Sequence, residues 1–341
     1  MEQVWPIEPI CAYLHPVAAI CAFFPEKKDC LFFTGGAATL YHPRVPTCVI
    51  FNPAARGNKA RHFRRYLDEI GGGAALKATA APGDARRLAA EAIRDGFTTI
   101  AAAGGDGTMN EVLNGIGDAN GFANTRLGVL PLGTMNVFAR ELKIPLGIKS
   151  AWEVLQRRHE IKLDLPLAEF TQNGKPAKQY FIQLAGAGLD ARAIELVDWS
   201  HKKKNGPLAY LIAGIKALRE RKPMIKAAEN GSPDKAFQGE LVMIGNGKFY
   251  GGPFDIFPGA DLNDGLLDVC IVPRADFKTV IGLVPNFLLR QRLSERAVKR
   301  FRTASFELSG EAGAAFQLDG EGIGHLPVKF SIAPDKLRVV A

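Results

Sequence analysis

Gly104-Gly105-Asp106-Gly107-Thr108-Met109-Asn110-Glu111 is the stretch that decides the fold of this chain. The apolar run 98–103 before it predicts a buried strand. The residues that follow predict a helix, because apolar side chains recur at i, i+3, i+4 and i+7: Met109, Val112, Leu113 and Ile116. The glycines therefore lie on a tight turn between a strand and a helix.

This turn has the chemistry of a phosphate site. Glycines carry no Cβ, so a ligand can approach the backbone closely. The free N–H groups at the start of the next helix favour an anion. Asp106 is itself an anion, so its expected role is to hold a cation that bridges phosphate oxygens, and Thr108 adds a hydroxyl. An isolated glycine pair would be an ordinary turn, but this combination predicts a nucleotide triphosphate site.

Composition narrows the class of protein. The 341 residues suffice for one large or two medium domains, and the 47% hydrophobic content supports a sizeable core. The formal net charge of +8 favours an anionic partner, whether phosphate, nucleic acid or anionic lipid. No apolar run reaches the ~20 residues of a membrane span, so membrane contact is expected to be peripheral. The sequence carries no signal for an oligomeric state.

Cysteine usage favours a reducing, cytoplasmic location. The cysteines are scattered and form no pair or His cluster with zinc-binding spacing: Cys11, Cys21, Cys30, Cys48 and Cys270. The acidic start, with Glu2 and Glu8, is unlike a signal peptide. Prolines repeatedly interrupt residues 1–44, which are expected to form a poorly ordered extension.

Residues 45–160 alternate strands with helices. Buried strands are predicted at 47–51, 76–80, 98–103 and 127–130. Amphipathic helices are predicted between them, and a short one at 136–142 ends before Pro145. This alternation predicts an α/β domain with an open, mostly parallel sheet, whose ligand turns lie at the carboxyl ends of the strands.

Residues 161–333 change character, because strand-like runs dominate. These runs lie at 161–165, 180–185, 239–244, 266–272, 304–308, 314–318 and 328–332. Helices are predicted at about 207–221 and 276–290. The second domain is therefore expected to be a mainly antiparallel β-sandwich. The last segment, 334–341, is expected either to end there or to return to the first domain.

Six blocks of sequence, in order, carry a family resemblance. They are Asn52-Pro53 with Gly57, Thr79 before Pro82-Gly83-Asp84, GGDGTMNEVLNG at 104–115, PLGTMNVFAR at 131–140, YGGPFDIFPGADLNDGLLDV at 250–269, and LDGE at 318–321. In these blocks the chain resembles the diacylglycerol kinase catalytic family, nearest the bacterial soluble lipid kinases and related to sphingosine and ceramide kinases. The resemblance covers about residues 47–341.

The resemblance implies ATP between two domains and a lipid hydroxyl as acceptor, with diacylglycerol giving phosphatidic acid. It implies a nucleotide site formed by Asn52, Pro53, Ala54, Ala55, Arg56, Thr79, Gly104, Gly105, Asp106, Gly107, Thr108, Met109, Asn110, Glu111 and Thr134. It assigns Asp319 as general base, with Glu321 beside it. It also implies a Mg²⁺ ion held by Asp261, Asp264 and the carbonyl of Leu266. A carboxylate near the acceptor hydroxyl suits this chemistry, because it can take the proton as the bond forms.

Two departures from the family pattern concern the nucleotide site. Val137 stands where the bacterial lipid kinases usually have an aspartate thought to reach magnesium through water. Ala55-Arg56-Gly57 replaces the usual Ser-Gly of the Asn-Pro turn. Arg56 either meets phosphate or is simply solvated. Val137 alone favours a nucleotide-binding regulatory protein with little turnover, and the presence of Asp106, Asp319 and Glu321 argues against it.

Other nucleotide enzymes remain as alternatives. GGDGT also occurs in NAD kinases, which are the enzymatic alternative, and no P-loop is present. Residues 186–191, Gly-Ala-Gly-Leu-Asp-Ala, mimic a dinucleotide fingerprint but lie in the β-rich half without a βαβ unit. The sequence therefore favours a lipid kinase over a nicotinamide-binding enzyme.

Basic residues cluster twice in the second half. One cluster contains His201, Lys202, Lys203, Lys204, Lys216, Arg219, Arg221 and Lys222, and the other contains Arg290, Arg292, Arg296, Lys299, Arg300 and Arg302. As a hypothesis, one cluster meets the head groups of an anionic membrane. No recognition motif accompanies the charge, so nucleic acid is not expected as a partner.

Overall fold

The computed structural model describes residues 30–34, 37–41, 47–54, 63, 65–66, 74–196, 207–229, 232–250, 255–279 and 298–341. The chain divides into two compact units, Met1–Val45 and Pro46–Ala341. In the first unit, β1 (Cys30–Thr34) pairs antiparallel with β2 (Ala37–Tyr41). The rest of the extension predicted at 1–44 lies outside the described residues.

The second unit begins with a mostly parallel sheet. Its strands are β3 (Thr47–Phe51), β4 (Ala75–Ala78), β5 (Thr99–Gly104), β6 (Arg126–Pro131), β7 (Glu160–Leu163) and β20 (Leu337–Val340). They lie in the order β4-β3-β5-β6-β20-β7. Strand β20 runs parallel to β6 and antiparallel to β7, so the last strand of the chain lies within this first sheet.

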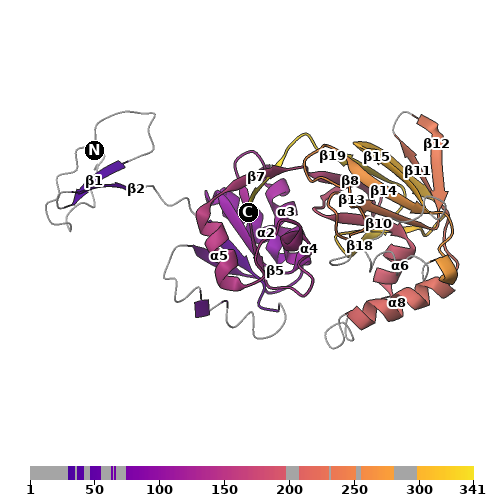
Figure 1. Cartoon of the computed structure of the whole chain (residues 1–341), viewed down its shortest axis with the longest axis horizontal. Coiled ribbons are helices and arrows are strands. Elements are labelled where there is room, and N and C mark those ends of the chain that lie inside the picture. Colours follow the sequence, from indigo (N-terminus) through magenta and orange to yellow (C-terminus); the bar gives the residue numbers. More distant parts are fainter. Residues whose placement is uncertain are drawn as a thin grey trace, which may run out of the picture. The chain divides into compact units, whose positions relative to one another are not determined.

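Helices cover both faces of this sheet (Figure 1). They are α2 (Asp84–Arg94), α3 (Asp106–Asp118), α4 (Val137–Glu141) and α5 (Ile148–Arg157). Helices α2 and α3 pack together on one face, and α5 lies on the other (Figure 1). Gly115 permits the close packing of α2 and α3, because a Cβ there would lie 2.2 Å from the carbonyl oxygen of Arg86.

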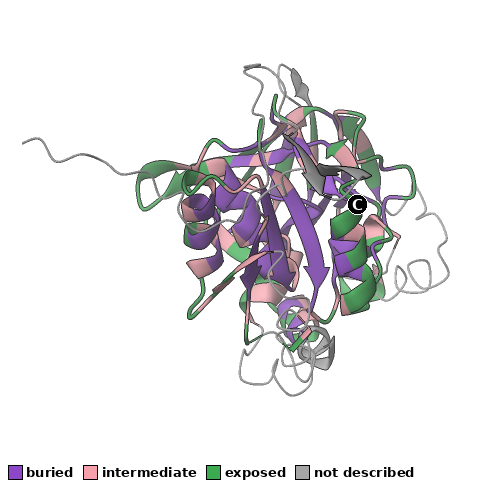
Figure 2. Ribbon diagram, turned by 90° about the vertical axis from the view of Figure 1, so that its left-hand side faces the viewer, coloured by how far each residue is buried: buried purple, intermediate pink, exposed green. Residues whose placement is uncertain are grey.

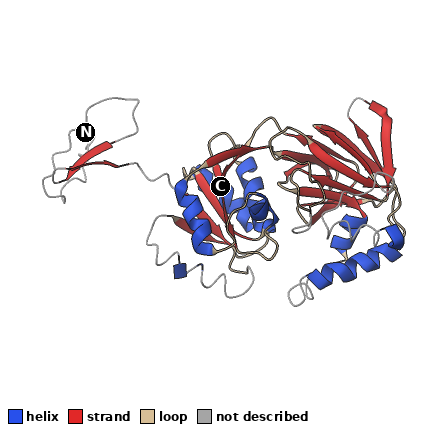
Figure 3. Ribbon diagram, in the orientation of Figure 1, coloured by secondary structure: helices blue, strands red, loops and turns tan. Residues whose placement is uncertain are grey.

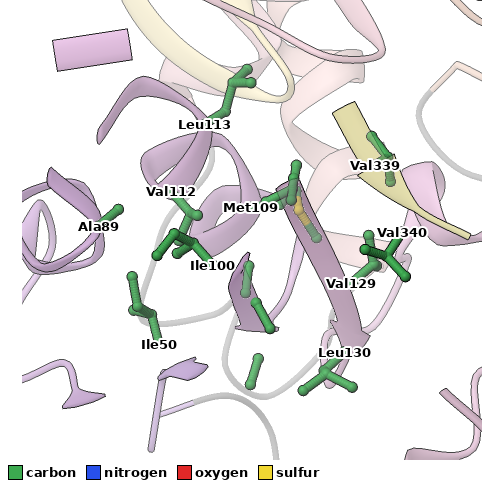
Figure 4. Packing of buried hydrophobic residues seen from close by; sticks show 14 of the residues in the cluster. Ile50, Ala89, Ile100, Met109, Val112, Leu113, Val129, Leu130, Val339 and Val340 are labelled. Carbon is green, nitrogen blue, oxygen red and sulfur yellow. The ribbon is translucent and has the colours of Figure 1, made fainter. Parts of the chain in front are cut away.

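The core of this domain follows from its apolar strands. All six residues of β5 are buried, as expected for a central strand covered on both faces. The strands form the buried centre between more exposed helices (Figure 2). Ile50, Ile100 and Val112 belong to one buried cluster, in which Val112 of α3 lies beside Ile100 of β5 (Figure 4).

Two antiparallel sheets form the rest of the unit (Figure 3). One sheet has the order β15-β14-β13-β10-β17-β18 and contains Lys299–Thr303, Leu267–Val272, Leu241–Gly245, Leu184–Gly188, Ala315–Leu318 and Glu321–His325. The other has the order β12-β11-β16-β19-β8-β9 and contains Ser232–Gly239, Ile225–Glu229, Ser305–Gly310, Val328–Ile332, Pro166–Gln172 and Lys175–Tyr180.

The two sheets bury one core between them. Ala187 and Phe316 contribute from the first sheet, and Phe306 and Phe330 from the second. On its other face the first sheet packs against α6 (Leu189–Glu195) and α8 (Pro207–Arg219), which lie beneath it in Figure 1. The predicted fold class, an α/β domain with a mostly parallel sheet followed by an antiparallel β-sandwich, is confirmed.

The chain crosses between the two parts twice. The first crossing joins β7 to β8, and the second joins β19 to β20. The crossings touch, because the backbone N–H of Ala333 donates to the carbonyl oxygen of Leu165 at 2.9 Å. The two parts are therefore connected at one place by two adjacent segments.

One predicted strand is wrong. The run 180–185 is not continuous, because β9 ends at Tyr180 and β10 begins at Leu184. The break has a physical reason: the N–H groups of Ile182, Gln183 and Leu184 turn towards the carboxylate of Asp319. Of the helix predicted at 276–290, the structure describes residues 277–279 as helical, and the remainder lies outside the described residues.

Candidate active site

The GGDGT turn connects β5 to α3. Gly105 is extended, and its carbonyl oxygen accepts the N–H of Met109 at 3.0 Å, which begins the helix. The side chain of Thr108 folds back over Gly104, where a Cβ would lie 2.4 Å from Thr108 Oγ1. Asn52 Nδ2 donates to the same Oγ1 at 3.2 Å. The turns that follow β3 and β5 are thereby joined.

A second glycine turn packs against the first. A Cβ on Gly133 would lie 2.5 Å from Gly105 Cα, so the two backbones touch. The Asn136 side chain accepts the N–H of Gly133 at 2.9 Å and donates to its carbonyl oxygen at 2.8 Å. The backbone N–H of Val137 donates to Asp106 Oδ1 at 2.8 Å. Val137 thus contacts the acid through its main chain.

The remaining predicted nucleotide residues line the same sheet edge. Asn52 Oδ1 accepts the N–H of Ala54 at 2.9 Å, which fixes the Asn-Pro turn. The N–H of Thr79 donates to the Phe51 carbonyl at 2.9 Å. The side chains of Pro53, Ala54 and Thr134 are exposed. Ala55 and Arg56 lie outside the described residues.

Two members of the 104–111 stretch have structural contacts instead. Met109 is buried in the core of the first domain (Figure 4). Glu111 accepts the N–H of Gly83 and the N–H of Ala85, each at 2.9 Å. These N–H groups belong to the first turn of α2, where a helix has no internal acceptors. Glu111 therefore caps α2.

The second domain brings a carboxylate pair on a hairpin. Strands β17 and β18 are joined by Asp319 and Gly320, with φ values of 48° and 86°. Two left-handed residues define a type I′ turn, for which Asp-Gly is a favoured pair. Glu321 begins β18, directly after the turn. The turn fixes where both carboxylates leave the backbone.

Asp319 is held by four donors. Its Oδ1 accepts the N–H groups of Gln183 at 2.9 Å and Leu184 at 3.1 Å. Its Oδ2 accepts the N–H of Ile182 at 2.8 Å and the Nδ2 of Asn110 at 2.8 Å. Burial raises the pKa of the Asp319 carboxyl, and these hydrogen bonds oppose the rise by stabilising the charged form. An ionised carboxylate has about four acceptor positions, so all are used.

The two domains meet at these groups. Asn110 lies on α3 of the first domain, and its contact with Asp319 crosses to the second. A Cβ on Gly107 would lie 2.5 Å from Glu321 Oε1, so that carboxylate rests against the GGDGT turn. The site therefore contains Asp106, Asp319 and Glu321, three acids that the sequence spreads over more than 200 positions.

The acids affect one another electrostatically. Burial is the main cause that raises the pKa of Asp106, and the nearby negative charge of Asp319 adds to it. Within the described residues no group of three or more His, Cys, Asp or Glu side chains could hold a metal ion. Magnesium commonly takes one or two carboxylates and completes its ligands with phosphate oxygens and water. Asp106 is the carboxylate that would hold magnesium arriving with a nucleotide.

The predicted magnesium loop is arranged differently. Asp261 Oδ1 accepts the N–H of Asn263, and Asp264 Oδ1 accepts the N–H of Leu266, each at 3.0 Å. The other oxygen of Asp264 is bound by the guanidinium of Arg302. These are local turn contacts and an ion pair with Arg302, and the magnesium ion expected at Asp261, Asp264 and the carbonyl of Leu266 stays a prediction.

Several residues of the site escaped the sequence analysis. Asn114 binds both backbone groups of Tyr180, through its Nδ2 at 2.9 Å and its Oδ1 at 2.9 Å. Glu141 Oε2 accepts Gln183 Nε2 at 2.8 Å and the N–H of Lys248 at 3.0 Å. Asn114 lies one helical turn after Asn110, and this i, i+4 pair on one face was the available signal. No feature of the sequence indicated Glu141 as a residue of the site.

Known proteins resemble the chain along most of its length. A family profile described as diacylglycerol kinase catalytic domain matches residues 46–167, and one described as YegS C-terminal NAD kinase beta sandwich-like domain matches residues 183–341. A protein of Pseudomonas aeruginosa (strain UCBPP-PA14) named "Probable lipid kinase YegS-like" is 34% identical over 275 residues, covering 80% of this chain and 85% of that protein. The chain belongs to the diacylglycerol kinase catalytic family.

Further members of the diacylglycerol kinase catalytic family agree. A protein named diacylglycerol kinase from Staphylococcus saprophyticus is 31% identical over 292 residues, covering 83% of this chain and 90% of that protein. A crystal structure of a diacylglycerol kinase from Bacillus anthracis shares the fold, with a TM-score of 0.64, 21% identity and coverage of 87% of this chain and 96% of that one. Family membership supports a lipid kinase activity that uses ATP.

Among the parts of the chain that the structure describes, no helix is long and apolar enough to cross a bilayer.

Proposed function

We propose that the chain transfers the γ-phosphate of ATP to the hydroxyl of a diacylglycerol-type lipid, forming phosphatidic acid. The observation that carries this proposal is the contact between the GGDGT turn of one domain and the Asp-Gly-Glu turn of the other. Phosphoryl transfer depends mainly on positioning and charge neutralisation, and the contact supports the proposal because it brings acids to the N-terminal end of α3.

The nucleotide would lie along the carboxyl edge of the first sheet. The glycine turns at Gly105 and Gly133 pack together at this edge, and the N-terminus of α3 favours negative charge. Asp106 would hold magnesium together with phosphate oxygens. When bound, that ion supplies neutralisation of the charge on the transferred phosphoryl group.

The geometry divides the roles of the two carboxylates in the hairpin. Asp319 already accepts four hydrogen bonds, so it can take a proton only by losing one. Glu321 leaves the same turn and reaches the start of α3. We therefore assign proton acceptance from the lipid hydroxyl to Glu321, in place of Asp319, to which the sequence assigned it. Asp319 instead fixes the loop 182–184 and α3 around the site.

Membrane contact is proposed at the end of α8. Lys216 and Arg219 are exposed in its last turns, and Ile215, next to Lys216 in the sequence, is also exposed. Near an anionic surface each basic side chain contributes ~1 kcal/mol. The neighbouring basic stretch 201–204 and the residues Arg290, Arg292 and Arg296 lie outside the described residues. Arg300 and Arg302 are engaged with the carbonyl of Ile256 and with Asp264 and Asp268.

A lipid pelleting experiment tests this surface. Vesicles with and without an anionic phospholipid are compared for the wild-type chain and for Lys216→Glu with Arg219→Glu. Binding that requires the anionic lipid and decreases in the variant supports the proposal. Equal pelleting with neutral vesicles, or an unaffected variant, contradicts it.

The acceptor is tested by phosphate transfer. The wild-type chain is incubated with γ-labelled ATP, magnesium and mixed micelles of single lipid alcohols: diacylglycerol, a sphingoid base and a monoacylglycerol. Label in phosphatidic acid at the highest rate supports the proposal. Transfer to NAD in a parallel reaction, without transfer to any lipid, would replace it with an NAD kinase activity. ATP binding without transfer to any acceptor would indicate a regulatory nucleotide-binding protein.

A further inference from the structure

A buried polar cluster lies beside the Asp-Gly-Glu turn. It contains Asp190 at the start of α6, Tyr250 and Gln317 of β17. Asp190 Oδ2 accepts the hydroxyl of Tyr250 at 2.8 Å and the Nε2 of Gln317 at 2.7 Å. The sequence flagged this region only as a false dinucleotide fingerprint, and the site described above does not include it.

The glycine of that fingerprint makes the cluster possible. Gly186 on β10 lies directly opposite Gln317 on β17. A Cβ at Gly186 would lie 2.1 Å from Asp190 Oδ2 and 2.4 Å from the hydroxyl oxygen of Tyr250. Only a residue without a Cβ leaves room for these side chains, so the Gly-Ala-Gly-Leu-Asp pattern reflects side-chain packing over Gly186.

The cluster ends at the hairpin turn. Gln317 Oε1 accepts the backbone N–H of Gly320 at 2.8 Å. In a two-residue hairpin the N–H of the second loop residue has no partner in the strand ladder. Gln317 supplies that partner from within the same hairpin. The other loop N–H, of Asp319, donates to the carbonyl oxygen of Leu184 at 2.8 Å. Both loop residues are thus fixed.

The orientation of the Gln317 amide depends on Asp190. A carboxylate accepts hydrogen bonds and donates none, so it selects the NH₂ end of the amide and leaves the oxygen for Gly320. Burial raises the pKa of Asp190, and the hydrogen bonds from Tyr250 and Gln317 oppose that rise. Burial and the nearby Asp190 raise the pKa of Tyr250 far above its usual value, so the hydroxyl stays a donor.

We propose that Asp190 is a positioning residue of the kinase site, which orients Gln317 so that its oxygen holds Gly320 and thereby fixes Asp319 and Glu321. Asp190 touches neither substrate nor the reacting atoms; it acts through one amide. The proposal rests on the proposed function, because the position of the turn affects catalysis only if Asp319 and Glu321 belong to the kinase site.

Reversing the hydrogen bond tests the proposal. In Asp190→Asn the amide of residue 190 can donate, so Gln317 loses the group that selects its orientation. In Gln317→Glu two carboxylates face each other. In the double variant, D190N with Q317E, the asparagine NH₂ donates to one oxygen of the glutamate, and the other glutamate oxygen still accepts the N–H of Gly320. The Tyr250 hydroxyl loses its acceptor at residue 190 and donates instead to the carbonyl oxygen of Ala185, 3.2 Å away. The double variant restores the chain of hydrogen bonds with both the charge and the shape conserved.

The expected result is a loss in each single variant and a recovery in the double. Each single variant should lower kcat about tenfold to hundredfold, with the KM for ATP within about twofold, since a misplaced turn affects the transition state more than nucleotide binding. The double variant should recover to within about fivefold of wild type. Asp268→Asn is the matched control on the same sheet, and its kcat should equal that of the wild type.

A second readout does not depend on turnover. Hydrogen exchange of the Gly320 amide, followed by mass spectrometry of peptides covering the 317–323 hairpin, should be about tenfold faster in each single variant and near wild type in the double.

A wild-type chain with no kinase activity refutes the proposed function, and the exchange pattern still tests the role of Asp190. Wild-type exchange and wild-type kcat in D190N overturn the inference, as does a double variant no better than either single one. If a single variant fails to fold, a folded double variant with protected Gly320 supports the inference, and an unfolded one overturns it.

Discussion

Asp319 shows how one residue connects the two domains. Its carboxylate collects three backbone N–H groups from the second domain and one side-chain amide from the first. A solvated hairpin turn would leave such an Asp-Gly pair without these partners. The family resemblance identified the Asp-Gly-Glu turn as a candidate site, but three of the donors are backbone groups of 182–184, which no residue type reveals. This is why the division of roles between Asp319 and Glu321 needed the structure.

Gly107 gives a prediction at this scale. In Gly107→Ala the new Cβ would lie 2.5 Å from Glu321 Oε1, so the glutamate must move away from the GGDGT turn. We expect kcat to fall about tenfold while the free energy of unfolding stays within about 1 kcal/mol of wild type, because alanine is favoured over glycine in a helix. Lipid phosphorylation rates and urea unfolding curves provide the two measurements.

Gly259→Ala is the matched control for this change. No heavy atom lies within 4 Å of a Cβ at this position, so activity should be unaffected. A wild-type kcat in G107A would show that catalysis does not require the contact between Glu321 and α3, and the role proposed for Glu321 would be wrong.

Among the helices and strands, those with strongly apolar patterns could be predicted from the sequence, and half-exposed strands could not. The completely buried β5 and the amphipathic α2 follow directly from their residue patterns. Strands β9 and β12 did not, because they lie at the edges of their sheet and are rich in polar residues. The strand predicted at 180–185 is interrupted where backbone N–H groups donate to Asp319. Hydrogen bonding to Asp319 there overrides the local pattern.

Strand pairing in the first sheet also gives a pH-dependent prediction. Glu160 of β7 accepts Arg126 Nε from β6 at 2.7 Å and Arg338 Nε from β20 at 2.7 Å. The hydrogen bond from Arg338 is the largest cause that lowers the pKa of Glu160, to about 2. A carboxyl whose pKa is lower in the folded than in the unfolded chain stabilises the fold at pH values above its unfolded pKa. This stabilisation is lost as the pH falls towards the folded pKa.

Glu160→Gln should therefore lower the free energy of unfolding by on the order of 1 kcal/mol at neutral pH. The difference from wild type should shrink as the pH falls from the ordinary glutamate value towards about 2. Chemical unfolding curves over this range measure it, with Glu169→Gln, a more exposed partner of Lys329, as the control. A difference that does not depend on pH contradicts the ion-pair explanation.

In the whole molecule, the fold depends on which distant segments of the chain pair with one another. The last strand, β20, lies between β6 and β7 of the first sheet, although the intervening chain builds the second domain. The two crossings between the domains touch at Leu165 and Ala333. Each part thus depends on segments from the far end of the sequence, and a short terminal strand of four residues gives little signal of this placement.

Removing β20 tests this dependence. A chain that ends at Lys336 leaves β7 without its pairing partner and β6 with an open edge. We expect it to lose cooperative unfolding and ATP binding, measured by circular dichroism and calorimetry. A chain that begins at Pro46, the start of the second compact unit, should keep both and serves as the control. Equal behaviour of the two shortened chains would contradict this prediction.

The central claim is that Glu321, held against the GGDGT turn, takes the proton when ATP phosphorylates a lipid. The most direct measurement compares phosphate transfer to diacylglycerol and ATP affinity in the wild type and in Glu321→Gln. The variant should bind ATP as tightly as wild type but transfer phosphate about 10²–10⁴-fold more slowly. A variant that binds ATP and phosphorylates diacylglycerol at the wild-type rate would contradict the claim.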